Sequence, residues 1–164
     1  MDEMRTFLLG VIVSPTYSPS MLLKFESRAL PDGTHSHYIT CRRPAPKDYL
    51  NRFPHDYVFD GETELSDEAI EREEWEGLVP ADRALQILDL FGDARKLPFT
   101  GEVMGGPGGN LYGLFFDKSA ADGLHCWLIE PPEEWAPLGR AVDELIYWAK
   151  TAYVKKFNRF FDLL

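Results

Sequence analysis

The sequence lacks the features that mark several common classes of protein. Its 164 residues include only two cysteines, and no apolar run approaches the ~20 residues that a transmembrane helix needs. Lys and Arg number 17 against 27 Asp and Glu, which disfavours nucleic acid or a membrane as the partner, because phosphates and anionic headgroups require an excess of cations. The net charge of −10 instead favours a protein partner with a basic surface.

Targeting and disulfide signals are also missing. Asp2 and Glu3 precede the apolar segment from Phe7 to Val13 and no small-residue cleavage site follows promptly, whereas a secretory signal starts with basic residues and ends in such a site. Cys41 and Cys126 lie in strand-like segments with no metal-type spacing. We therefore expect reduced, buried thiols and a cytoplasmic location.

No catalytic motif stands out. The glycine-rich stretch MGGPGGN at residues 104–110 matches neither a P-loop nor a dinucleotide-binding pattern, and the segment after it resembles a strand rather than a helix. His125 and Cys126 are adjacent, so in a strand they point to opposite faces and cannot form a nucleophile–base pair. The sequence predicts no enzyme and no cofactor.

The sequence is rich in the apolar and aromatic residues that form a packed core. Four Trp, seven Tyr and eleven Phe, with 45% apolar residues, predict one folded domain over residues 1–164. Alternating or apolar segments bounded by turn residues predict strands, and these lie at Thr6–Val13, Met21–Leu30, Thr34–Arg42, 99–104, Leu111–Asp117 and Leu124–Ile129. The first three form a meander in this interpretation, and the last two form a hairpin.

Helical spacing marks two further segments. Apolar residues recur at helical intervals from Pro80 to Gly92, and a long stripe runs from Leu138 through Tyr153 toward Phe160. Strands in runs, rather than in strict alternation with helices, indicate an α+β fold. We expect a largely antiparallel sheet of about five to six strands with helices on one face and a long C-terminal helix.

The acidity is concentrated at residues 60–76, which carry nine acidic residues and one Arg. Ser66 is a suitable N-cap, so we expect a short helix here with a largely solvated surface. Trp75 is either the centre of a docking surface or the anchor that holds this helix on the domain. The predicted partner-binding residues are Glu68, Glu71, Glu73, Glu74, Trp75 and Glu76.

Histidines give a weaker signal. His35 and His37 share one face of the third strand, and His55 could complete a metal site with them. Two histidines next to a turn are more often surface residues, so we assign no metal and keep these three as weak candidates.

The last third of the chain carries a resemblance. GEVMGGPGGNLYGLFF, followed by DGLHCWLIEPPEEWAPLGRAVDELIYWA, is similar to small acidic α+β bacterial proteins encoded beside polymorphic or secreted toxins, some of which are immunity proteins. The resemblance implies a cytoplasmic inhibitor that neutralises a cognate toxin by occlusion. The alternatives are a small-ligand binding domain or enzyme with its cleft between sheet and helices, and a homodimer whose exposed aromatic residues contact a second copy.

Overall fold

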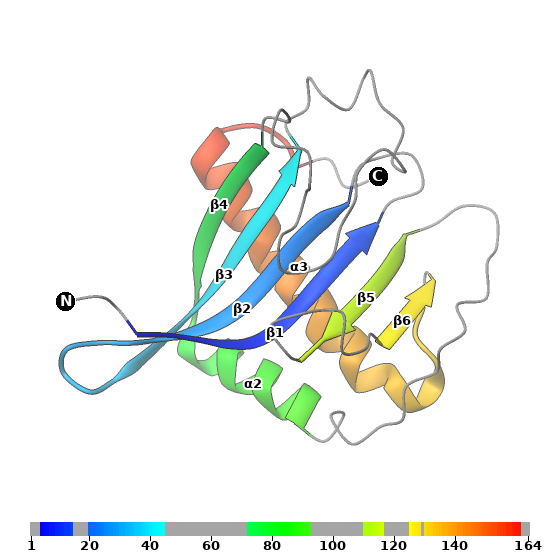
Figure 1. The fold of residues 1–164 in the computed structure, drawn as a ribbon, viewed down its shortest axis with the longest axis horizontal. Helices are drawn as coiled ribbons and strands as arrows, with labels where there is room; N and C mark the ends of the chain where they lie inside the picture. The colour runs from blue at the N-terminus through cyan, green and yellow to red at the C-terminus, as the bar shows by residue number, and fades with distance from the viewer. Residues whose placement is uncertain are drawn as a thin grey trace.

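The protein is described by a computed structural model, which places residues 4–14, 20–44, 72–92, 110–116, 125–128 and 130–161. These residues form one antiparallel sheet with two α-helices, as Figure 1 shows. The predicted α+β class and the long C-terminal helix are confirmed.

Six strands make up the sheet, in the order β4-β3-β2-β1-β5-β6. Every neighbouring pair is antiparallel. The meander of the first three strands and the hairpin of the last two are therefore both confirmed. The strands span Arg5–Ser14 (β1), Met21–Ala29 (β2), His35–Pro44 (β3), Arg72–Val79 (β4), Leu111–Phe115 (β5) and His125–Leu128 (β6).

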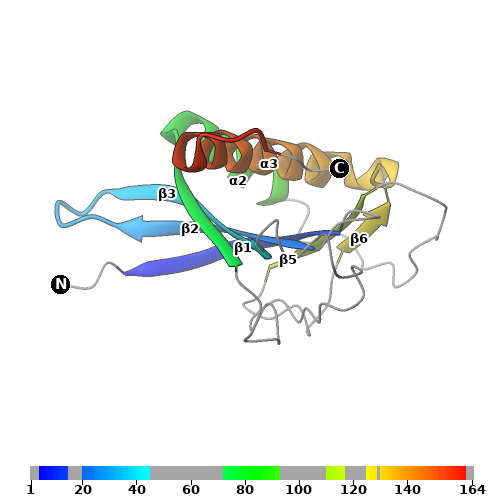
Figure 2. The ribbon, with the colours of Figure 1, turned by 90° about the horizontal axis from the view of Figure 1, so that it is seen from above.

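Both α-helices lie on the same face of the sheet (Figure 2). Helix α2 spans Ala81–Gly92 and α3 spans Ala136–Phe157, preceded by a short 3-10 helix at Glu133–Trp135. Asn158 ends α3 in the left-handed conformation, with φ of 51°. None of the helices in the described parts is both long and apolar enough to cross a membrane.

The core lies between the helices and the inner face of the sheet. Alternate residues of the central strands point into it, because strand side chains alternate between the two faces. The helices contribute the stripes expected from their sequences, including Ile87 of α2 and Leu145 of α3, both fully buried. The buried strand residues of this core include Leu9, Val11, Val13, Leu23, Phe25, Ile39, Trp75 and Leu114.

The outer face of the sheet is not covered by either helix. Its side chains over β2, β3 and β4 are mostly charged or polar, whereas an aromatic pair lies over β1. Phe7 and Phe115 stack there with ring centroids 5.7 Å apart. A Cβ added to Gly10 would lie 2.0 Å from the Phe115 ring, so glycine is the residue that allows this ring to lie flat on the strand.

The prediction of a helix in the acidic segment is wrong for residues 72–76, which belong to strand β4. This segment alternates in burial along its length, with Glu73, Trp75 and Val79 buried and Glu74, Glu76 and Leu78 exposed. The expected start of the helix at Ser66, the expected strand at 99–104 and the glycine-rich stretch at 104–110 lie outside the described residues.

A larger side chain at residue 10 should destabilise the fold. Gly10→Val forces the Phe115 ring off the strand, and overpacking of this kind costs about 1–3 kcal/mol. Chemical denaturation of the variant measures this loss. Gly92→Ala is the matched control, because a Cβ at residue 92 meets no atom of the described residues within 4 Å. Equal free energies of unfolding for the two variants would contradict the close packing of Phe115 on Gly10.

Candidate functional site

A groove of about 1120 Å³ bends around the edge of the sheet formed by β4. We call it the β4 groove. On one side it is lined by the uncovered face of the sheet, including Arg5, Lys24, Glu26, Thr40 and Arg42. Its floor is β4 itself, from Glu74 to Leu78, and its other side is the outer surface of α3.

The α3 side combines one aromatic residue with small and cationic residues. It consists of Trp148, Thr151, Ala152, Lys155 and Lys156. Helix α3 packs closely on β4 here, since a Cβ added to Gly77 would lie 2.6 Å from the Cβ of Ala152. Figure 1 shows that the C-terminal end of α3 emerges beyond β4. The helix therefore forms one side of the groove, next to the β4 floor.

A ladder of ion pairs crosses the sheet side of the groove. Arg28 is buried, lies 3.9 Å from the Tyr38 ring centroid, and donates hydrogen bonds to Glu26 and Glu76. The hydrogen bond from Arg28 lowers the pKa of Glu76 and, in the opposite direction, the same contact raises the pKa of Arg28. These charges are therefore held in their ionised forms.

Glu74 also has a cationic partner on each side. Its carboxylate lies 2.9 Å from Nε of Arg42, and its main-chain carbonyl accepts a hydrogen bond from Nζ of Lys156. The Glu74 side chain is nevertheless 58% exposed. An exposed carboxylate with one surface ion pair keeps most of its hydration, so Glu74 remains able to contact a partner.

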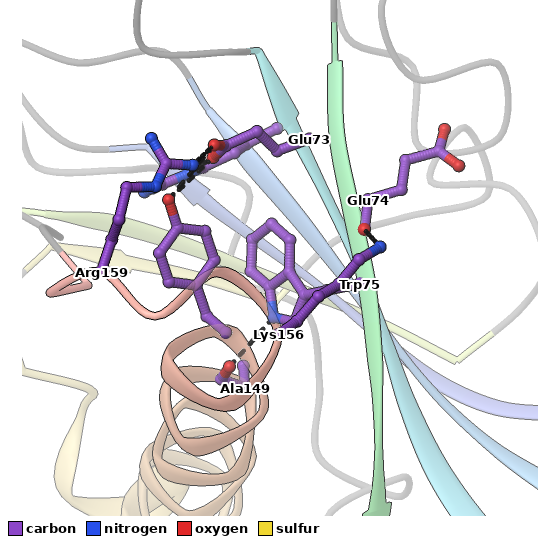
Figure 3. A network of polar contacts seen from close by, with 8 residues as sticks. Glu73, Glu74, Trp75, Ala149, Lys156 and Arg159 are labelled. Carbon is purple, nitrogen blue, oxygen red and sulfur yellow. Dashed lines mark hydrogen bonds and ion pairs between the residues drawn. The ribbon is translucent and has the colours of Figure 1, made fainter.

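A second polar network lies on the inner face of β4, as Figure 3 shows. Glu73 is 7% exposed, and its carboxylate accepts hydrogen bonds from Arg43, Tyr153 and Arg159. The guanidinium of Arg43 also lies 4.7 Å from the Tyr153 ring centroid and 4.8 Å from that of Phe161. The carboxylate therefore joins β3, β4 and the end of α3.

Trp75 sits beside this network. It is 3% exposed, donates a hydrogen bond from Nε1 to the carbonyl of Ala149, and lies edge-on to Tyr153 at 4.9 Å between centroids. Trp75 holds strand β4 against α3, where the sequence analysis expected it either to anchor a helix or to form the centre of a docking surface. A residue with this burial cannot be the exposed centre of a docking surface on β4.

The structure thus divides the predicted partner-binding residues into three groups. Glu73 and Trp75 point into the protein and are corrected to core residues, because the strand turns every second side chain inward. Glu74 and Glu76 point outward and line the β4 groove. Glu68 and Glu71 lie outside the described residues.

The histidine candidates do not reach this groove. His35 is exposed and its Nδ1 lies 3.2 Å from Oγ of Ser27. His37 is partly buried and stacks on Phe25, and burial lowers its pKa. Among the described residues, no three His, Cys, Asp or Glu side chains are placed to hold a metal ion together. His55 lies outside the described residues.

Cys41 is a free thiol in the core, as expected from the sequence. Its complete burial raises the pKa of the thiol well above the ordinary value, because the thiolate would lose its hydration. Cys41 is therefore held as an unreactive thiol. The side chain of Cys126 lies outside the described residues.

The sequence analysis missed the α3 side of the groove. Lys155, Lys156 and Trp148 line it, and none of them was singled out from the sequence. The signal that could have found them is the alternation in REEWEGLV, which places Glu74 and Glu76 on one face of a strand and Trp75 on the other. A strand at that position needs a covering helix.

In comparisons with known proteins, no family model matches the chain, and no curated protein or solved structure matches it significantly.

The buried network predicts unequal effects at two neighbouring glutamates. Glu73→Ala removes the buried carboxylate that pairs with Arg43 and Arg159, and breaking a buried ion pair in this way costs about 3–5 kcal/mol. Glu74→Ala removes only a surface ion pair, which is worth about 0–1 kcal/mol. Chemical denaturation of both variants measures the difference. Similar losses at the two positions would contradict the role of Glu73 as the buried partner of Arg43.

The Arg28–Glu76 pair predicts a pH-dependent contribution to stability. The pKa of Glu76 is lower in the folded protein than its ordinary value of 4.5, so its stabilisation is present above about pH 4.5 and is lost as the pH falls through the folded pKa. We expect the difference in unfolding free energy between the wild type and Glu76→Gln to shrink from pH 7 to pH 3. A difference that stays constant over this range would contradict the pairing.

Proposed function

We propose that this chain is a protein-binding inhibitor of the immunity type, which acts in the cytoplasm and neutralises a cognate toxin by occlusion. The partner binds in the β4 groove and is blocked because the groove and the strand edge cover its working surface. The observation that carries the proposal is the groove itself, which is open and lined by the outer face of the sheet, by edge strand β4 and by α3.

The composition of the groove suits recognition of a polypeptide. Leu78 is 59% exposed and lies in the same groove as Trp148, so apolar and aromatic surface is available for burial. Charged side chains of both signs surround them, including Glu76 and Lys155. An apolar centre with a charged rim is the usual anatomy of a protein interface.

Charge favours a basic partner on the strand side of the groove. The outward carboxylates of Glu74 and Glu76 lie there, about half exposed and each paired with one arginine, and the sequence at 60–71 carries six acidic residues with no basic one. Glu68 and Glu71 belong to that stretch. Steering by such a charge can raise association from about 10⁵–10⁶ to about 10⁸–10⁹ M⁻¹s⁻¹ at low salt, which suits an inhibitor that must capture its target quickly.

A small-ligand site is the competing function. Pockets for small molecules are usually about 300–1,000 Å³ and enclose most of the ligand. The β4 groove is slightly larger than this range and is bounded by a strand edge. Neither His35 nor His37 lines it, so the polar groups that this function would use are not gathered in it.

A growth assay tests the proposal. A polypeptide recovered stoichiometrically with this chain from the native cells should inhibit growth when it is expressed alone, and co-expression of this chain should restore growth. The double variant Leu78→Asp, Thr151→Asp should lose this protection, because it places charge in the apolar part of the groove.

The matched control is Leu85→Asp, which changes an equally exposed leucine outside the groove, on α2. We expect Leu85→Asp to protect growth as well as the wild type does. A bound metabolite in native mass spectrometry, with no polypeptide partner, would contradict inhibition and support the small-ligand function.

A further inference from the structure

The edge of β4 has main-chain groups that no other strand of the described residues uses. Pro44 pairs with Arg72 and has no N–H, so this pair cannot be a hydrogen-bonded one. Hydrogen-bonded and non-hydrogen-bonded pairs alternate along an antiparallel ladder. The N–H and C=O groups of Glu74, Glu76 and Leu78 therefore point away from β3, like those of Arg72.

Part of this edge is already occupied. The carbonyl of Glu74 accepts a hydrogen bond from Lys156, which reaches across from α3. Within the described residues, no hydrogen bond from outside the sheet reaches the main chain of Glu76 or Leu78. These two residues thus offer two N–H groups and two C=O groups to a further strand.

The β4 groove provides the space that such a strand needs. It runs along the edge of β4, and its α3 wall is formed next to Gly77 by Thr151 and Ala152, which are small. A strand added to a sheet lies about 4.7–4.9 Å from its neighbour. Its side chains then alternate between the uncovered face of the sheet and the α3 wall.

We propose that the protein partner contributes an extended segment that pairs antiparallel with β4 at Glu76 and Leu78 and becomes a seventh strand of the sheet. The proposal rests on the proposed function, because it specifies how the protein partner binds. The partner's segment carries basic side chains opposite Glu74 and Glu76, and an acidic side chain between them on the α3 side.

Charge complementarity selects this pattern. Glu74 and Glu76 project from the outer face, and each is about half exposed beside its ion pair with an arginine, so a cation opposite can add a second, cross-strand ion pair. The intervening position faces the other wall, where Lys155 and Lys156 line the groove. A segment that alternates basic and acidic residues therefore matches both walls at once.

The same charges disfavour a second copy of this chain as the occupant. If two β4 edges paired antiparallel over their centres, Glu74 would lie opposite Glu76 of the other copy, or two Glu76 side chains would face each other. Like charges directly opposite destabilise a pair of strands. A homodimer through β4 is therefore opposed by its own side chains.

Selection from a phage-displayed library of random nine-residue peptides, with the full chain as bait, tests the proposal. We expect enriched peptides in which Lys or Arg alternates with other residues, and an acidic residue between two cations. No enrichment, or enrichment of sequences without alternating cations, would overturn the proposal.

Two matched variants separate the main chain from the side chain at the edge. Leu78→Pro removes the outward N–H, which a proline on an edge strand can do without breaking the pairing with β3. Leu78→Val shortens the side chain and keeps the N–H. We expect the selected peptides to bind Leu78→Pro roughly tenfold more weakly and Leu78→Val within about threefold of the wild type. Equal binding to both variants would overturn the proposal.

N-methylated peptides give a second test on the wild-type chain, which does not depend on how well Leu78→Pro folds. Methylation of the peptide N–H groups that face β4 should abolish binding. Methylation of the N–H groups between them, which point away from β4, should leave the affinity within about threefold of the unmethylated peptide. Equal losses at both sets of positions would overturn strand pairing.

The outcomes also separate this proposal from the proposed function. A polypeptide that copurifies with the chain and binds Leu78→Pro and wild type equally overturns strand pairing and leaves inhibition in place. The selected peptides could instead bind as expected while the chain protects cells against no toxic polypeptide. That result would support the strand site and contradict inhibition.

Discussion

Burial of the Glu73 carboxylate constrains the part of the molecule where the β4 groove lies. A buried charge must be paired, and Glu73 meets this requirement with Arg43 from β3 and with Tyr153 and Arg159 from the end of the chain. The partners come from segments that are 30 to 86 residues away. They can meet only when β4 has one register on β3 and α3 lies directly over both strands.

That register decides which side chains become available on the outside. A slip of one residue would turn Trp75 to the solvent and bring Glu74 and Glu76 against α3. The observed register places Trp75 against Ala149 and leaves the two glutamates on the uncovered face, where Arg42 and Arg28 balance them. The inner network and the outer charge ladder are therefore two consequences of the same pairing of β3 with β4.

Much of the fold follows from local sequence patterns. The alternation in Met21–Ala29 and the helical stripe in Ala136–Phe157 both extend over enough residues to identify the element without tertiary information. The same patterns placed both helices on one face, because runs of strands and runs of helices pack in that way. These predictions needed only the chemistry of neighbouring residues.

The candidate site needed more than that. The local sequence REEWEGLV does not show which of two adjacent glutamates is buried. Glu73 differs from Glu74 in its contact with Arg43 on β3, which only the folded structure shows. The density of acidic residues also suggested a solvated helix. The alternation of inward and outward side chains, which places Trp75 in the core, was therefore overlooked. The groove was missed for a related reason. Its floor comes from β4 and one side from α3, where Thr151 and Lys155 lie more than 70 residues later in the sequence.

The edge of β4 shows how protection against self-association and availability for a partner can coexist. Proteins protect exposed strand edges with charged side chains. Here Lys156 donates a hydrogen bond to the Glu74 carbonyl, and the adjacent glutamates disfavour pairing with a second copy of the same strand. This protection is selective by sign on each face, because Glu74 and Glu76 favour basic side chains on the outer face, whereas Lys155 and Lys156 favour acidic ones on the α3 side. It also stops short of Leu78, where the strand edge meets exposed apolar surface. The charges that prevent pairing between copies are thus the charges that would determine which foreign strand is accepted.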